Sequence, residues 1–155
     1  MKKQLKRIKP EHGYYIAGFA DGEGSFNVSL KKRKDYNGGW KITASFNISQ
    51  KDRVILSFIK KTMSCGTLRE RKDGVIYFEV TNIKSLYEKV IPFFRKFRFL
   101  SANKKRNFSI FSQIVEKMYK GEHMTREGFL EIVRLREKLN TGISRKRKYT
   151  LKDVL

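Results

Sequence analysis

The stretch IAGFADGEGSF, residues 16–26, is the most unusual run in the chain and the part of the sequence on which the fold depends. Together with the residues just before it, its apolar spacing predicts a short helix over residues 13–22. Gly18 and Gly22 lie one turn apart on that helix, and small residues at this spacing let a second helix approach backbone to backbone. Each glycine costs the helix about 1 kcal/mol relative to alanine, so we expect a packing or functional role to offset the cost.

Two acids, Asp21 and Glu23, fall at the C-terminal end of this predicted helix. The helix dipole disfavours anions there, so their position indicates a bound cation or another function. A simpler interpretation stays open at this point. Gly22 and Gly24 would then only end the helix and turn the chain into a strand, and both acids would be surface residues.

Two hairpins follow the helix, each marked by alternating apolar and polar residues on both sides of a glycine turn. The first pairs residues 25–33 with 40–49 across Asn37-Gly38-Gly39, and the second pairs 67–72 with 75–81 across Asp73-Gly74. Helical periodicity predicts further helices over residues 52–63, 84–97, 101–119 and 125–139. The order is α-ββ-α-ββ-α-α-α, which predicts an α+β domain with helices on one face of an antiparallel sheet.

The alternation gives the predicted sheet one apolar face and one polar face. Short hydrogen-bonding groups and long cations share the polar face, and these suit base edges and phosphates respectively. The set is Ser25, Asn27, Ser29, Lys31, Arg33, Lys41, Thr43, Ser45, Asn47, Ser49, Thr67, Arg69, Arg71, Tyr77 and Glu79. An ordinary solvated sheet face shows the same alternation, so the pattern alone does not decide between the two.

The charge balance favours nucleic acid. The 155 residues include 36 Lys and Arg against 15 Asp and Glu, a formal net charge of +21. Nucleic acid is the first candidate to relieve that self-repulsion, and an acidic membrane surface is the second. We expect a basic N-terminal arm (1–10) and a basic C-terminal tail (140–155) to order only on a partner. Within the tail, the candidate contacts are Arg145, Lys146, Arg147 and Lys148.

The composition also excludes several classes of protein. The single cysteine, Cys65, cannot form an internal disulfide or a cysteine-based zinc site. No apolar run is long enough for a transmembrane helix, and none follows the basic N-terminus as a secretory signal requires. We therefore expect one domain over residues 1–155 with its core at 11–139, in a bacterial or archaeal cytoplasm or an organelle and not secreted.

Residues 16–24 resemble the nine-residue signature of the LAGLIDADG homing endonucleases. Ala17, Gly18, Asp21 and Gly24 match the signature by identity, and Glu23 stands in for its final aspartate. The predicted αββαββα order also matches that family's core, so the resemblance covers motif and topology over residues 13–119. It implies a saddle-shaped antiparallel sheet that lies in the DNA major groove, with helices packed on its other face.

The resemblance implies a role for each signature residue. Glu23, the last acid, would bind a divalent metal with help from the Gly22 carbonyl. Mg²⁺ is the expected ion, although Mn²⁺ or Ca²⁺ can occupy such an oxygen site. Ala17, Gly18, Asp21 and Gly22 would lie where two signature helices pack together, with Asp21 also structural near the helix end. Single-motif members work as homodimers, so this chain looks like half of an active enzyme.

Further active-site residues follow from the same resemblance. Gln50 matches a glutamine that orders solvent at the end of the second strand in dimeric relatives. A basic residue is typical four positions later, but this chain has Val54 there, and the adjacent Arg53 is the candidate substitute. Lys104 and Lys105 are candidates for a lysine that polarises the water or the scissile phosphate, with Lys104 preferred. Phosphate contacts or solvated charges would explain the basic residues equally well.

The function implied is a homodimeric, Mg²⁺-dependent endonuclease that makes a double-strand break in a long, near-palindromic DNA target. Such enzymes are usually encoded in mobile introns or inteins. One alternative is an intron RNA maturase or a non-cleaving DNA-binding regulator on the same fold. Loss of the metal-binding acid would favour that alternative, and Glu23 is present. A basic RNA-packaging protein would explain the charge but not the acids at the glycine-rich helix end.

Overall fold

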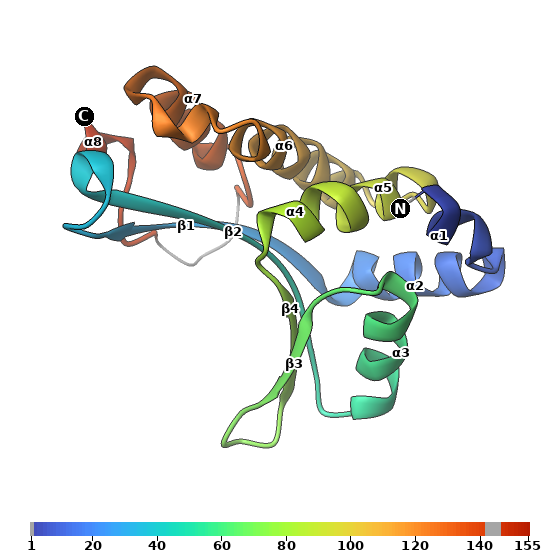
Figure 1. The fold of residues 1–155 in the computed structure, drawn as a ribbon. Coiled ribbons are helices and arrows are strands. Elements are labelled where there is room, and N and C mark those ends of the chain that lie inside the picture. The colour runs from blue at the N-terminus through green and yellow to red at the C-terminus, as the bar shows by residue number, and fades with distance from the viewer. Residues whose placement is uncertain (1, 142–146) are drawn as a thin grey trace.

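The computed structural model describes residues 2–141 and 147–155 and has the predicted α+β arrangement (Figure 1). The strands are β1 (Gly24–Lys32), β2 (Trp40–Gln50), β3 (Thr67–Glu70) and β4 (Ile76–Val80). The longer helices are α2 (Pro10–Glu23), α3 (Arg53–Met63), α6 (Ala102–Tyr119) and α7 (Arg126–Glu137). Shorter helices are α1 (Lys2–Arg7), α4 (Ile83–Ser85), α5 (Ile91–Lys96) and α8 (Leu151–Val154), and helical turns cover Asn37–Gly39, Leu86–Val90 and Glu122–Met124.

The four strands form one antiparallel sheet in the order β1-β2-β4-β3. Both predicted hairpins are therefore present, and β2 and β4 join them at the centre of the sheet. Figure 1 shows the sheet curving strongly, so that the β1–β2 hairpin and the β3–β4 hairpin extend in different directions. The αββαββα order and the sheet predicted from the sequence are confirmed.

Phenylalanine rings fill the space between the sheet and the helices. Phe26 of β1 lies 5.1 Å from Phe46 of β2 and 4.9 Å from Phe111 of α6, measured between ring centroids. Phe94 of α5 stacks on Phe99 at 4.6 Å. All five side chains are buried, and each contributes about 1.5–3 kcal/mol of transfer free energy. This core covers the apolar face of the sheet and leaves the polar face to solvent.

Helix α2 begins three residues earlier than predicted and ends one residue later. Pro10 suits the first turn, because its missing N–H is not needed there and its φ is already helical. Gly13 then lies against the Phe97 ring, where a Cβ atom would come within 2.3 Å of ring carbons. At the other end, the N–H of Gly24 donates to the Ala20 carbonyl as the chain enters β1.

The helix predicted over 84–97 is instead divided around a π-helical turn, Leu86–Val90, which lies between α4 and α5. Pro92 explains the division, because a proline in a helix interior has no N–H for the carbonyl four residues back. The pattern of hydrophobic residues in the sequence does not reveal such a local change of helix pitch. The other predicted helices agree with the structure to within two residues at each end.

The N-terminal arm is not loose in the structure. Residues Lys2–Arg7 form α1, Ile8 is buried, and the Lys96 ammonium donates to the Leu5 carbonyl at 2.9 Å. The sequence-based expectation of an arm that orders only on a partner is wrong for these residues. Their basic composition indicated solvation, whereas a few apolar side chains among them hold the segment against α5.

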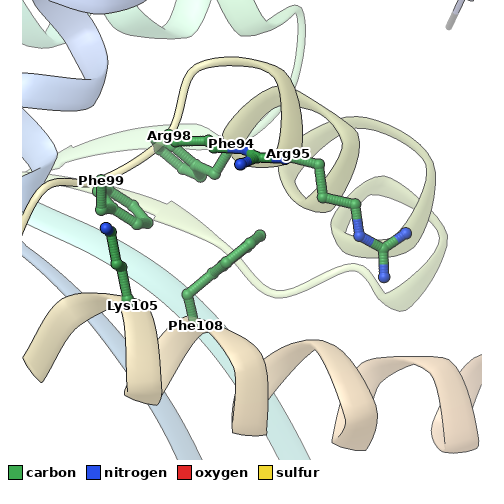
Figure 2. A pocket seen from close by; sticks show the side chains of 6 residues that line it. All are labelled: Phe94, Arg95, Arg98, Phe99, Lys105 and Phe108. Atoms are coloured by element: carbon green, nitrogen blue, oxygen red, sulfur yellow. The ribbon is translucent and has the colours of Figure 1, made fainter. Parts of the chain in front are cut away.

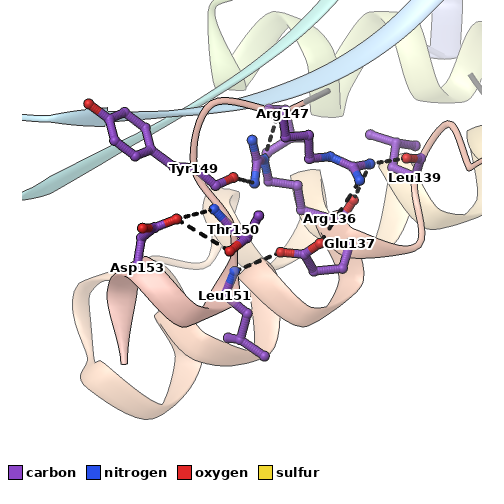
Figure 3. A network of polar contacts seen from close by, with 9 residues as sticks. Arg136, Glu137, Leu139, Arg147, Tyr149, Thr150, Leu151 and Asp153 are labelled. Atoms are coloured by element: carbon purple, nitrogen blue, oxygen red, sulfur yellow. Dashed lines mark hydrogen bonds and ion pairs between the residues drawn. The ribbon is translucent and has the colours of Figure 1, made fainter. Parts of the chain in front are cut away.

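The described part of the C-terminal tail is also packed (Figure 3). Arg136 of α7 is buried and donates to the Val28 carbonyl of β1 at 2.8 Å and to the Tyr149 carbonyl at 2.9 Å. The Tyr149 ring contacts Trp40 edge-on at 4.9 Å, and Val154 of α8 is buried. The prediction of a loose tail is therefore wrong for residues 147–155. Arg145 and Lys146 lie outside the described residues.

Over residues 2–141 and 147–155, the helices are all too short or too polar to cross a membrane.

Candidate functional site

The predicted contact residues of the sheet lie on one face and form rows across the strands. Strand register places Ser25 opposite Asn47, Asn47 opposite Glu79, and Glu79 opposite Thr67. The next row contains Ser49, Tyr77 and Arg69, and the outer rows pair Asn27 with Ser45, Ser29 with Thr43, and Lys31 with Lys41. The grouping of these residues on the polar face is confirmed by the register.

Lys31 and Lys41 stand directly opposite each other on this face. Like charges in a directly opposed pair destabilise a sheet. An anion between or above them would remove that repulsion. The pair is therefore suited to an anionic ligand, although the Lys41 ammonium also lies 5.7 Å from the centre of the Tyr36 ring.

Several members of the predicted set need correction. Asn47 is on the polar face but only 8% exposed, so little of its amide is free for a ligand. Arg33 and Arg71 lie just beyond the ends of β1 and β3, in the hairpin turns. Arg147 donates to the backbone carbonyls of Arg136 and Leu139, so its guanidinium supports the fold.

A second group of residues meets where α2 ends. Glu23 is the last residue of α2 and is exposed, and the following Gly24 pairs with Ile48 of β2. Gln50 lies two residues beyond Ile48, about 7 Å farther along the strand. The structure thus brings Glu23 and Gln50 to the same corner of the sheet, as the resemblance implied.

Asp21 fixes a third element to this corner. Its carboxylate accepts hydrogen bonds from the Ser101 hydroxyl at 2.5 Å, the Leu100 N–H at 2.9 Å and the Ser101 N–H at 3.1 Å. Burial opposes its ionisation, but the three hydrogen bonds outweigh burial and lower the pKa of the Asp21 carboxyl. Ser101 is in turn the N-cap of α6 and accepts from the Lys104 N–H. The sequence did not assign Ser101 a role, although a serine before a helical pattern is a recognised cap signal.

Of the two candidate lysines, Lys104 is the one that reaches the end of α2. Its ammonium donates to the carbonyl of Gly24, next to Glu23 in the chain. Burial lowers the pKa of the half-buried Lys104 amine, and the charge of Asp21 partly opposes the shift. This ammonium lies beside the corner, where it can meet an anionic group.

Lys105 points elsewhere. It lines a pocket of about 410 Å³ between α5 and α6, together with Arg95, Arg98 and three phenylalanines (Figure 2). Phe94, Phe99 and Phe108 form its apolar wall. The structure therefore separates Lys104 and Lys105, which the sequence left as alternatives for one role.

Arg53 stands at the start of α3 and forms an exposed ion pair with Glu70 of β3 at 3.6 Å. Val54, at the position where a basic residue was expected, is 77% exposed. Glu70 therefore competes with any anionic ligand for the Arg53 guanidinium. A catalytic role for Arg53 remains a prediction.

The face of α2 around Gly18 and Gly22 is open to solvent. Both glycines are exposed, and a Cβ atom at either position would meet nothing within 4 Å among the described residues. Tyr14 and Tyr15 on the same helix are more than half exposed, although their rings contact Phe97 and Phe58 edge-on. Ala17 is 2% exposed in the core, so its assignment to a dimer interface is corrected. The carboxylate of Asp21 likewise bonds within its own chain.

The oxygen atoms at this corner suit a hard cation. Glu23 supplies an exposed carboxylate, and the Gly22 carbonyl belongs to the end of α2, where helix carbonyls generally lack intrahelical donors. The described residues contain no group of three or more His, Cys, Asp or Glu side chains arranged to share an ion. A metal ion at this corner would therefore need further ligands, for example from a second chain or a phosphate.

Comparisons with known proteins agree with this geometry. Residues 16–115 match the model of the LAGLIDADG endonuclease family. The chain belongs to the LAGLIDADG endonuclease family. A "Probable intron-encoded endonuclease 2" of Neurospora crassa is 36% identical over 145 residues, which are 91% of this chain and 32% of that protein. "DNA endonuclease I-CvuI" of Chlorella vulgaris is 33% identical over 84 residues, which are 51% of this chain and 52% of that protein.

Solved structures of family members superpose closely on the model. The archaeal intron-encoded homing endonuclease I-Vdi141I, solved in complex with DNA, gives a TM-score of 0.85 at 35% identity and covers 94% of this chain and 92% of its own. The homing endonuclease I-TnaI gives 0.82 at 30% identity, covering 96% and 99%. The LAGLIDADG fold predicted from the motif is therefore confirmed. The chain spans about a third of the length of the Neurospora relative.

Proposed function

We propose that this LAGLIDADG chain is a homing endonuclease that acts as a homodimer and makes a double-strand break in a long, near-palindromic DNA target. The observation that carries the proposal is the end of α2, where Lys104 donates to the carbonyl of Gly24, the residue after Glu23, and where the strand register brings the end of β2 with Gln50 nearby. The corner offers an oxygen ligand and a cation next to a surface suited to DNA. Relatives named as DNA endonucleases support the same activity.

A homodimer would supply the second active-site corner and the second sheet that one chain lacks. The exposed Gly18 and Gly22 leave the backbone of α2 open to close approach by a second helix. A two-fold axis next to this helix would place two copies of the corner side by side, one for each DNA strand. The two sheets would then extend outward along the DNA in opposite directions and read a near-palindromic sequence.

The residues at the corner divide the chemistry between them. Glu23 and the Gly22 carbonyl would hold Mg²⁺, and this ion supplies Lewis-acid stabilisation of the oxygens in phosphodiester hydrolysis when bound. Gln50 orients solvent through its amide. Lys104 places a positive charge near the phosphate, and Asp21 keeps Lys104 in position by fixing the cap of α6. The related structure of I-SmaMI was determined with calcium, which fits a divalent oxygen site in the family.

The polar face supplies DNA binding. Its hydroxyls and amides match base edges, and its lysines and arginines match phosphates. A twisted two-stranded ribbon such as β1–β2 fits the major groove. We place the protein inside the cell, and the relatives named as intron-encoded support an origin in a mobile intron.

The decisive experiment is cleavage selection on a library of randomised near-palindromic DNA, with Mg²⁺ and with EDTA. We expect metal-dependent cuts at one enriched site with the wild type. Glu23→Gln should bind that site and fail to cut it, while Glu11→Gln, at the opposite end of α2, should cut normally. Tight binding of DNA by the wild type without any cutting would contradict the proposed endonuclease activity. RNA would then be the next ligand to test.

The same cleavage assay distinguishes the roles of Lys104 and Lys105. Lys104→Met should slow cutting about 100-fold or more, in the range that a positioned ionisable group contributes. Lys105→Met should leave the cutting rate within about threefold of the wild type, because Lys105 faces the pocket of Figure 2. Equal losses in both variants would show that a general loss of positive charge, and not the position of Lys104, matters.

A further inference from the structure

The tip of the β1–β2 hairpin holds an arginine in a defined orientation. Arg33 lies just after β1, and its Nε and one terminal nitrogen, Nη2, donate to the two carboxylate oxygens of Asp35 at 2.9 and 2.8 Å. The guanidinium also lies 5.5 Å from the centre of the Tyr36 ring. Both charged side chains remain about half exposed, so the pair faces solvent and not the core.

The contact with Asp35 uses only one edge of the guanidinium. Arginine has five N–H groups, and this contact uses one on Nε and one on Nη2. The opposite edge keeps one N–H on each terminal nitrogen, parallel to each other. Two parallel donors match the N7 and O6 acceptors that guanine alone presents together in the major groove.

The second hairpin contains a similar arginine–aspartate pair, joined by a single hydrogen bond. Arg71 follows β3, and its Nη2 donates to a carboxylate oxygen of Asp73 at 2.9 Å. The other oxygen of Asp73 accepts from the Val75 N–H at 3.1 Å, so the hairpin turn anchors the carboxylate. Both turns therefore contain an arginine and an aspartate two positions later, at the ends of two hairpins that Figure 1 shows extending apart.

We propose that Arg33, oriented by Asp35, reads a guanine in each half of the DNA target, and that Arg71, oriented by Asp73, reads a second guanine. This inference rests on the proposed DNA-cleaving function and names residues that determine its sequence specificity. The aspartates act as positioning residues, because they contact the arginine and not the base. An ordinary surface ion pair would contribute little to stability and would confer no base preference.

The strand geometry gives the position of the first guanine. Arg33 lies nine residues beyond Gly24, which is the residue where β1 leaves the catalytic corner. At about 3.3 Å per residue this is roughly 30 Å, or about nine base pairs of DNA at 3.4 Å each. We therefore expect the Arg33 guanine in the outer part of each half-site, at positions related by the two-fold axis.

The test measures base preference at every position of the selected target, using binding and cleavage of single-base variants. Replacing guanine opposite Arg33 should weaken wild-type binding about tenfold or more. Arg33→Met removes all the guanidinium donors and should abolish that preference, whereas Arg33→Lys, which can still donate to guanine N7 and O6, should only weaken it. Asp35→Asn should reduce the preference on the order of threefold to tenfold, and less or not at all when Arg33 is already Met.

Lys34→Ala is the matched control, because Lys34 is an exposed cation in the same turn, between the two residues of the pair. It should weaken binding equally for all bases. If Arg33→Met binds and cuts with the wild-type preference at every position, the inference is overturned and the proposed function stands. If the wild type neither selects nor cuts any DNA, the inference fails together with the proposed function. Thermal melting of each variant confirms that the fold is intact.

Discussion

Asp21 joins parts of the chain that are 80 residues apart in sequence. The signature places it in the last turn of α2, where the helix dipole disfavours an anion. Three donors from Leu100 and Ser101 offset that disadvantage and tie α2 to the start of α6. The motif alone assigns Asp21 both to a dimer interface and to a structural role. The structure favours the structural role, because Asp21 fixes the N-cap of α6 and so positions Lys104.

Asp21→Asn should lower the free energy of unfolding by about 1–2 kcal/mol at pH 7, because an amide accepts these hydrogen bonds less strongly than a carboxylate. The pKa of Asp21 is lower in the folded state than its ordinary value of 3.8, so its stabilising effect is complete above that value and is lost as pH falls through the folded pKa. Urea unfolding at pH 7 and at a series of pH values below 3.8 measures this. A difference between wild type and variant that does not shrink as the pH falls below 3.8 would contradict the assignment.

Helix α2 has two kinds of glycine, and the sequence could not separate them. Gly13 is required by its own chain, because the buried Phe97 ring occupies the place of a Cβ atom. Gly18 and Gly22 face open space. The contact between Gly13 and Phe97 could not be predicted, because the two residues are 84 positions apart in the sequence. The regular spacing of Gly18 and Gly22, in contrast, is visible in the motif itself.

Gly13→Ala and Gly18→Leu should therefore affect different properties. Gly13→Ala should destabilise the folded chain by about 1–2 kcal/mol, because the clash with Phe97 exceeds the roughly 1 kcal/mol gained in helix propensity. Gly18→Leu should leave the helix content unchanged and shift the protein to monomer by preventing close helix approach. Circular dichroism melting and sedimentation equilibrium measure the two effects. Normal dimerisation of Gly18→Leu would contradict the proposed interface.

The sheet was the most predictable element, and the segments packed on it were less so. Alternating residues on both sides of Asn37-Gly38-Gly39 determine a hairpin locally, and the observed register follows from that alternation. The docking of residues 147–155 depends instead on the buried Arg136 and on carbonyls of β1 and the tail itself. No local pattern in a run of basic residues reveals such distant acceptors.

The tail has a built-in reporter, because Trp40 is the single tryptophan of the chain and packs against Tyr149. Tyr149→Ala should shift the Trp40 emission to longer wavelength and lower the unfolding free energy by about 1–3 kcal/mol, through lost ring contact and apolar burial. Leu155→Ala is the control, since that side chain is 70% exposed at the end of the same segment. Unchanged emission from Tyr149→Ala would show that the tail is not docked in solution.

Over the whole molecule, the cations outnumber the acids by 21, and the paired acids are mostly at turns and on the helix layer. The hairpin ends keep their arginines next to aspartates, whereas Lys31 and Lys41 stand opposite each other in the register, with the Lys41 ammonium 5.7 Å from the centre of the Tyr36 ring. The same surface therefore carries both ion-paired arginines and an opposed pair of lysines. We expect the lysines to add an attraction to the DNA backbone that does not depend on base sequence.

This distribution predicts a steep salt dependence of DNA binding. If a dimer meets about ten phosphates, log K should fall by about nine per unit of log salt concentration. Lys31→Ala should reduce the slope by about two per dimer, one phosphate from each chain, whereas Lys84→Ala in α4 of the helix layer should not change it. Fluorescence anisotropy across a salt series, with DNA of the selected sequence and of random sequence, measures both. A slope near zero would contradict the sheet as the DNA-binding surface, because a face carrying opposed lysines can bind DNA only by displacing the counterions of its phosphates.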